Sequence, residues 1–180
     1  ELLQNASDID ISSMKDYNDE RYNTDNYYTY YAYNPYWMVD NNYSKYQDDR
    51  FYGKLELSYD ILDDLKLVGR IGGDFSNYVT KTYDGKLTYN EGSYQHKGNG
   101  ATAAEPGYYS KYRYNKGQID ASILLMGNHQ FGDFNVGGTL GWNLNEITYD
   151  YTGAYNEALN IDGWFNFNNT TSYSIAEEYT

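Results

Sequence analysis

Cysteine is absent from this chain of 180 residues, and proline occurs only twice. A chain without cysteine has no disulfide framework and no thiol chemistry. The sequence also contains no run of about 18 apolar residues, which excludes a transmembrane helix. Residues 1–10 contain neither the basic nor the apolar region of a signal peptide, so we expect an internal fragment or a chain whose signal has been removed.

Basic residues and histidines are also scarce. Thirteen lysines and arginines face 26 acidic residues, which gives a net charge of −13 and excludes the basic footprint of a nucleic-acid-binding protein. The only histidines are His96 and His129, and neither a Ser/His/Asp arrangement nor a histidine-rich metal motif is present. We therefore predict no enzymatic activity, no catalytic residue, no cofactor and no bound metal.

Tyrosine is the residue that the chain has in excess, with 25 copies. Such a sequence is too aromatic for ordinary disorder, because disordered chains contain few aromatic residues. It is poor in long apolar side chains, so it does not readily supply a large soluble core. This composition therefore favours a fold that does not depend on a large aliphatic core.

Four segments alternate polar and apolar residues with period two, which predicts strands with two different faces. The segments are residues 50–61, 65–79, 116–131 and 134–147. Each is long enough for the 9–11 residues that a strand needs to cross a bilayer. Within the parts that alternate most clearly, residues 50–61, 65–76, 118–131 and 134–145, no charged residue lies on the apolar faces. The opposite faces carry eight charged residues, namely Arg50, Lys54, Glu56, Asp60, Lys66, Arg70, Asp74 and Asp120.

The connections between these segments are either very short or very long. Residues 62–64 and 132–133 form tight hairpin turns, whereas 80–115 and 148–180 are long connections. Outer-membrane barrels combine short periplasmic turns with long extracellular loops. A soluble β-sandwich would produce the same alternation, because any half-buried sheet does. The connection lengths favour the barrel.

Several stretches, in order, resemble the SusC/RagA family of TonB-dependent outer-membrane transporters. Residues 34–37 read Asn-Pro-Tyr-Trp, and 49–55 contain an Arg-Phe-x-Gly strand. Residues 65–74 end in Arg-x-Gly-x-Asp. Residues 8–17 resemble the segment that precedes these motifs. Residues 159–166 resemble a family loop that usually reads Pro-Gly-Phe-Phe-Asn, although Asp162 replaces its proline and Trp164 one of its aromatic residues.

The resemblance implies an all-β fold, an antiparallel meander that forms part of a 22-stranded transmembrane β-barrel. Residues 1–49, 80–115 and 148–180 would be extracellular, and 50–79 and 116–147 would be two membrane hairpins. The chain would belong to the outer membrane of a Gram-negative bacterium and import glycans or peptides. Its partners would be outer-membrane lipid, the rest of the barrel and plug, a SusD-like surface lipoprotein, and TonB through a region outside these residues.

Candidate substrate-binding residues are aromatic. Of the 25 tyrosines, 22 lie outside the four segments, where they either stack on a substrate or pack the loops and the barrel rim. We select Tyr36, Trp37 and Trp164 as the substrate-binding candidates. An acidic run over residues 8–25 is a conceivable calcium site, but its spacing fits a solvated loop better. A soluble, secreted β-sandwich that binds carbohydrate, or an adhesin module, remains the alternative function.

Overall fold

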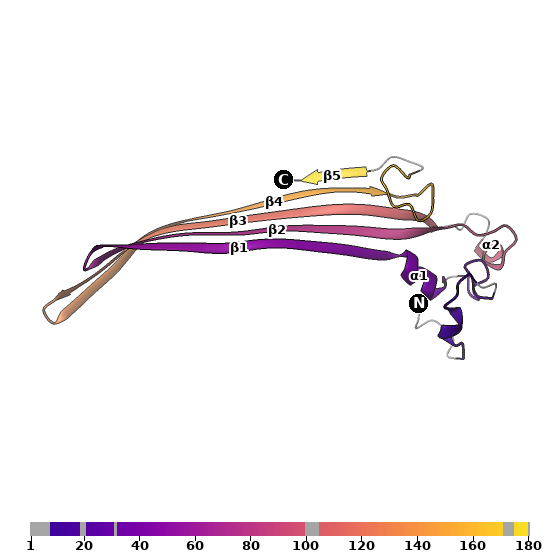
Figure 1. The fold of residues 1–180 in the computed structure, drawn as a ribbon, viewed down its shortest axis with the longest axis horizontal. Coiled ribbons are helices and arrows are strands. Elements are labelled where there is room, and N and C mark those ends of the chain that lie inside the picture. The colour runs from indigo at the N-terminus through magenta and orange to yellow at the C-terminus, as the bar shows by residue number, and fades with distance from the viewer. Residues whose placement is uncertain (1–7, 19–20, 31, 100–104, 171–174, 180) are drawn as a thin grey trace. The chain divides into compact units, whose positions relative to one another are not determined.

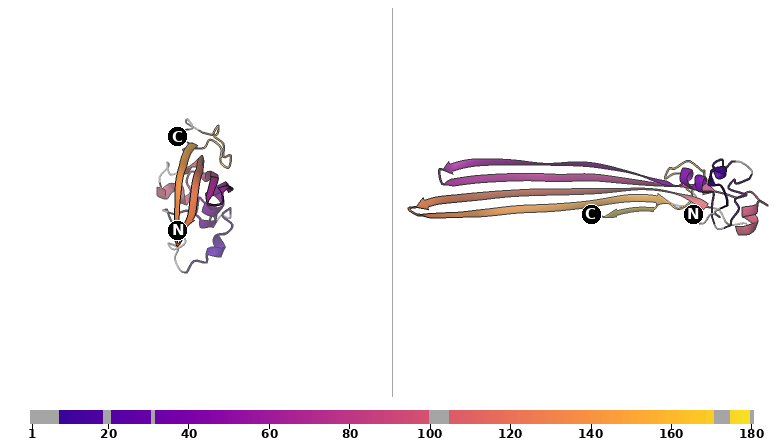
Figure 2. Two further views of the ribbon diagram at one scale, coloured as in Figure 1. Left: turned by 90° about the vertical axis from the view of Figure 1, so that its left-hand side faces the viewer. Right: turned by 90° about the horizontal axis from the view of Figure 1, so that it is seen from below.

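The computed structural model of this chain describes residues 8–18, 21–30, 32–99, 105–170 and 175–179. Its five strands form one antiparallel sheet in which the order across the sheet is the order along the chain (Figures 1 and 2). The strands are β1 (Tyr43–Leu62), β2 (Leu65–Leu87), β3 (Glu105–Phe131), β4 (Phe134–Asn156) and β5 (Ile175–Tyr179). The helices are short: η2 (Ile11–Met14), α1 (Pro35–Asn41) and α2 (Tyr94–Asn99).

The predicted all-β fold and the four-strand meander are confirmed, and both tight turns lie where the sequence puts them. The predicted strands are too short, however. β1 begins at Tyr43, β2 continues to Leu87, β3 begins at Glu105 and β4 continues to Asn156, so parts of the predicted loops 1–49, 80–115 and 148–180 are strand. These extensions carry tyrosines and polar residues on both faces, so they lack the alternation by which a strand is recognised. β5 was not predicted at all.

The chain divides into two compact units, each built from three segments. We call residues 47–79, 113–152 and 178–180 the hairpin unit, and residues 1–46, 80–112 and 153–177 the loop unit. Among the described residues, no helix is both long enough and apolar enough to span a membrane.

The strands of the hairpin unit keep one register along the β3–β4 pair. The Asp120 carboxylate accepts a hydrogen bond from the Asn145 side chain, Lys116 lies over the ring of Tyr149, and Asn115 donates to Asp150 at 2.9 Å. The two residues of each pair lie equally far from the turn at 132–133. Side chains therefore alternate strictly between the two faces of this hairpin.

One face of the hairpin unit is apolar and exposed. Leu55 on β1 is 58% exposed and Leu140 on β4 is 74% exposed. The described strands form a single sheet and do not divide into two packed sheets that bury these leucines against each other. Other exposed apolar side chains on this face are Phe51, Leu57, Tyr59, Ile61, Leu67, Ile71, Phe75, Ile119, Ile123, Phe131, Phe134, Val136, Trp142 and Leu144.

The loop unit has its own small core. One cluster contains Met14, Tyr27 and Ala32, and a second contains Trp37, Leu87 and Tyr89. Tyrosine rings thus fill positions that aliphatic side chains occupy in most cores, and their hydroxyl groups must reach polar partners or water. This packing explains why a chain poor in long apolar residues still builds an ordered loop region.

Asn34 fixes the start of α1 and holds it to the N-terminal segment. Its side chain is fully buried, and its amide oxygen accepts hydrogen bonds from the backbone N–H groups of Tyr36 (2.9 Å) and Trp37 (3.3 Å). Its amide nitrogen donates to the carbonyl oxygens of Met14 and Tyr22, both at 2.9 Å. Asparagine is a favoured N-cap and proline is favoured at the next position, so the Asn-Pro-Tyr-Trp stretch is a helix start in this structure.

Candidate functional site

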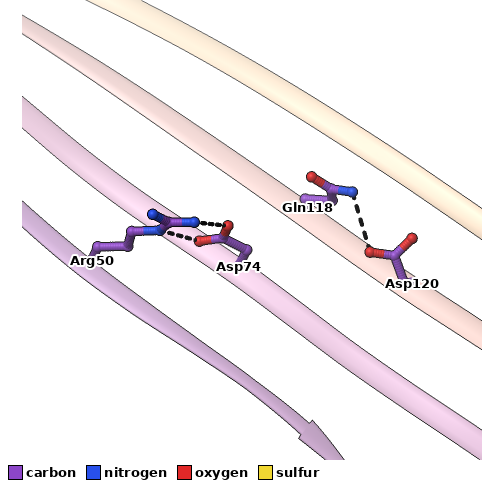
Figure 3. A network of polar contacts seen from close by, with 4 residues as sticks. All are labelled: Arg50, Asp74, Gln118 and Asp120. Atoms are coloured by element: carbon purple, nitrogen blue, oxygen red, sulfur yellow. Dashed lines mark hydrogen bonds and ion pairs between the residues drawn. The ribbon is translucent and has the colours of Figure 1, made fainter.

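The polar face of the hairpin unit gathers most of its charged side chains. Arg50 on β1 holds Asp74 on β2 through two hydrogen bonds, at 2.8 Å from Nε and 2.5 Å from Nη2 (Figure 3). This fork-to-carboxylate contact is the strongest geometry available to an arginine. It joins two of the motif segments that carry the family resemblance, since Arg50 belongs to the first and Asp74 ends the second.

Two further ion-pair groups lie along the same pair of strands. Glu56 accepts from Arg70 at 2.7 Å and lies 3.5 Å from the ammonium group of Lys54. Nearer the turn, Lys66 and Asp60 are 3.5 Å apart. These pairs are solvent-exposed, so each contributes little to stability. Their main effect is to leave the β1–β2 part of the face close to electrically neutral.

Asp120 on β3 differs because its described partners are neutral amides. Gln118 donates to it at 3.2 Å, as Figure 3 shows, and Asn145 of β4 donates to its other oxygen. A hollow of about 670 Å³ in the sheet surface is lined by Arg70, Asp74 and Asp120, among other residues. The face therefore offers alternating donors and acceptors, suited to a hydroxyl-rich or amide-rich ligand rather than to an ion of one sign.

A second cluster of polar side chains lies in the loop unit, where a tyrosine hydroxyl donates a hydrogen bond to a carboxylate. The Tyr33 hydroxyl donates to the Glu105 carboxylate, and burial followed by this bond raises the pKa of Tyr33 far above its usual value. Burial, and then the negative charge of Glu105, raises the pKa of Asp84. Tyr33 thus stays protonated as a donor, and the arrangement holds residue 33 to the start of β3 rather than supplying a catalytic base.

The three predicted substrate-binding residues have different surroundings. Trp37 is only 6% exposed and packs with Leu87 and Tyr89, so its ring serves the core of the loop unit. Tyr36 is half-buried against the cluster around Met14. Trp164 is 47% exposed, which makes it the most accessible of the three.

The loop that carries Trp164 is held by asparagine side chains. Asn169 is fully buried, donates to the carbonyl oxygens of Ile161 and Trp164, both at 2.6 Å, and accepts from the Ile161 N–H at 2.9 Å. Gly163 supplies the left-handed backbone that the tip requires, with φ of 70°. Lys86 anchors the loop by donating to the Leu159 carbonyl at 2.8 Å. Trp164 is therefore presented by an ordered loop.

We expect Asn169→Ala to loosen this loop. The substitution leaves two carbonyl groups and one N–H group without their partner, a loss of roughly 1–3 kcal/mol. Protease cleavage within residues 157–170 of the folded full-length protein should become about tenfold faster or more, since local opening controls cleavage. The neighbouring Asn168→Ala, at an exposed position, is the control. Equal cleavage rates for the two variants would contradict the role given to Asn169.

Several members of the acidic run have local hydrogen-bond partners. Asp10 caps η2 by accepting from the Ser12 N–H at 2.9 Å, and Asp25 accepts from the Asn90 side chain at 2.5 Å. Residues 19 and 20 lie outside the described residues. Within the described ranges, no group of three or more His, Cys, Asp or Glu side chains is placed to hold a metal ion.

Sequence reasoning separated the two faces but missed which charges pair. No motif predicted that Arg50 would meet Asp74, because that pairing depends on the register between β1 and β2. Comparison with protein-family models and with curated proteins finds no match to this chain.

Proposed function

We propose that this chain forms part of the wall and the extracellular loops of a TonB-dependent transporter in the outer membrane of a Gram-negative bacterium. The observation that carries the proposal is the division of the hairpin unit into two faces. The face described above as apolar exposes its leucine, isoleucine and aromatic side chains, while Arg50, Glu56, Arg70 and Asp120 lie on the other. A lipid-facing and a lumen-facing surface require this division.

The height of the apolar face supports a membrane. On β1 it extends from Phe51 to Ile61, about 34 Å along an antiparallel strand at about 3.4 Å per residue. With the tilt of roughly 40° that such barrels have, this length projects to about 26 Å, close to the apolar band of about 25 Å in outer-membrane barrels. Soluble monomers rarely expose apolar patches of more than a few hundred Å².

On β1, β2 and β3 the apolar face ends at one level, whereas on β4 it becomes polar earlier, from Glu146 onward. Next to Phe51 and Phe75, the same face continues with Asp49 on β1, Asn77 on β2 and the Asn115–Asp150 hydrogen bond between β3 and β4. Aromatic side chains followed by polar ones match the girdle at a membrane–water interface.

The strand edges imply further polypeptide. The sheet has two open edges, one along β1 and one along the part of β4 that the short β5 does not cover, and in lipid each free backbone group would cost several kcal/mol. We propose that they pair with the rest of a 22-stranded barrel whose plug contacts TonB. A SusD-like lipoprotein would cover the extracellular side, and the imported substrate would be an oligosaccharide or a peptide. Of the candidate substrate-binding residues, Trp164 is the one we assign to substrate contact.

Single-cysteine labelling in the full-length protein tests this proposal. The 180 residues contain no cysteine, so Glu91→Cys in the connection between β2 and β3 and Asp133→Cys in the β3–β4 turn introduce unique sites in this region. Both positions are exposed. A membrane-impermeant maleimide should label the Glu91→Cys variant on intact cells. It should label the Asp133→Cys variant only after the outer membrane is opened.

The other outcomes separate the alternatives. Labelling of both variants on intact cells would reject a membrane-spanning hairpin. Labelling of the Asp133→Cys variant but not of the Glu91→Cys variant on intact cells would reject the proposed orientation. A protein recovered from the medium without detergent would support the soluble β-sandwich or adhesin module instead.

A further inference from the structure

Four tyrosines form a row across four neighbouring strands of the hairpin unit: Tyr78 (β2), Tyr114 (β3), Tyr151 (β4) and Tyr179 (β5). The ring centroids of successive members are 6.0, 4.8 and 5.6 Å apart, and the ring planes are tilted by 43°, 46° and 31°. We call these residues the tyrosine row. One ring from each strand thus contributes to a continuous aromatic surface.

The tyrosine row lies on the polar face, the one that carries the ion pairs. Tyr114 is two residues from Lys116 on β3, and Tyr151 is two residues from Tyr149 on β4, so alternation puts each on the same face as its neighbour. Lys116 and Tyr149 contact each other, with the ammonium group 5.8 Å from the ring centroid. In the proposed transporter this face looks into the lumen.

The rings keep surface available to a ligand. Tyr114 is 46% exposed and Tyr179 is 64% exposed. A hollow of about 440 Å³ is lined by the row together with Ser76, Lys116 and Tyr149. Flat aromatic surface beside a few hydrogen-bonding groups is the usual composition of a small-molecule site.

The position of the row favours saccharide over peptide. An extended peptide binds a sheet by adding to an open edge, where backbone N–H and C=O groups are free. Three of the four rings stand on β2, β3 and β4, which have a neighbouring strand on both sides, so this part of the surface offers side chains and no free backbone groups. A pyranose ring matches such a surface, because its C–H face stacks on an aromatic ring while its hydroxyls bond to polar groups at the rim.

We propose that the tyrosine row is a binding subsite for an oligosaccharide, whose successive sugar rings lie across the strands on successive tyrosines. The inference rests on the proposed function for its setting in a transport lumen, and it selects glycan over peptide as the substrate class. It assigns a site that neither the sequence motifs nor the exposed Trp164 indicated.

The test uses the purified full-length protein and three neutral probes: maltohexaose, cellohexaose and mannohexaose. Calorimetric titration should detect binding of at least one probe. Tyr114→Ala and Tyr151→Ala should each weaken that binding about tenfold or more, which corresponds to about 1.4 kcal/mol. Tyr151→Trp, which restores an aromatic face, should retain most of the affinity.

Tyr59→Ala is the matched control, because Tyr59 is an exposed β1 tyrosine (68%) on the apolar face, opposite to the row. It should change the affinity less than threefold, and an unchanged circular dichroism spectrum shows that each variant is folded. Binding of none of the three probes, or equal losses from Tyr59→Ala and Tyr151→Ala, would overturn the proposal. So would Tyr151→Trp binding as weakly as Tyr151→Ala. Labelling on cells is independent of glycan binding. A failure of the glycan titration therefore leaves the transporter proposal standing, and a failure of the labelling experiment does not decide whether the tyrosine row binds glycan.

Discussion

Replacing Leu140 with arginine is expected to block assembly of the full-length protein in the outer membrane or to destabilise it by roughly 2–4 kcal/mol, the cost of arginine at the lipid face near the bilayer midplane. Leu140 lies near the middle of the apolar face on β4 and is 74% exposed in this sheet. Assembly is measured by the heat-dependent shift in electrophoretic mobility of the outer-membrane fraction, and stability by urea unfolding in detergent.

Asn143→Arg is the matched control. Asn143 is on the same strand, three residues further along, and lines the polar hollow with Arg70 and Asp120. Its arginine variant should assemble almost normally, because water in a lumen solvates the added charge. Comparable losses from the two substitutions would contradict a lipid face and would mean that both faces of the sheet are covered by protein.

Removing the side chain of Asn34 is expected to have the second largest effect. Asn34→Ala deletes an N-cap and leaves the carbonyl groups of Met14 and Tyr22 without a donor. Together these losses amount to roughly 2–4 kcal/mol. Hydrogen exchange in the full-length protein should show faster exchange at the backbone amides of α1, Trp37 among them.

Two further variants separate the contributions of Asn34. Asn34→Ser keeps a capping oxygen but cannot donate to both carbonyl groups, so its exchange rates should fall between those of the wild type and Asn34→Ala. Asn18→Ala, at an exposed position in the same unit, should leave α1 unchanged. Equal protection of α1 in Asn34→Ala and Asn18→Ala would show that other contacts fix this helix.

The hairpins were predictable from sequence because their two faces meet different surroundings. Between Arg50 and Ile61, for example, every second residue is apolar or glycine, and the alternation stops at a turn rich in aspartate. The strand extensions were not predictable in this way. At Tyr43, Tyr83 and Tyr109 the sheet packs aromatic residues against one another, with ring centroids 4.7 and 5.5 Å apart, and no polar–apolar contrast marks the strand.

The candidate sites show the same limit. Trp164 is exposed and Trp37 lies in the core, although the sequence made both of them substrate-binding candidates. Burial of a single ring depends on long-range packing, here against Leu87 and Tyr89. The tyrosine row could not be predicted from the sequence for a related reason. Its four members are far apart in the chain, and only the register of the strands brings them together.

The unbroken register of β3 and β4 also constrains how this hairpin can change in length during evolution. One residue inserted between Asp120 and the turn would move every residue of β3 before it to the opposite face, taking Asp120 to the apolar side and Ile119 to the polar side. Two residues inserted in one strand would preserve its faces, whereas one in each strand at matching distance from the turn would keep the pairs but move both members to the opposite face. Each strand of a homologous hairpin should therefore differ in length by even numbers, and single-residue changes should occur only in the turns or together with a β-bulge.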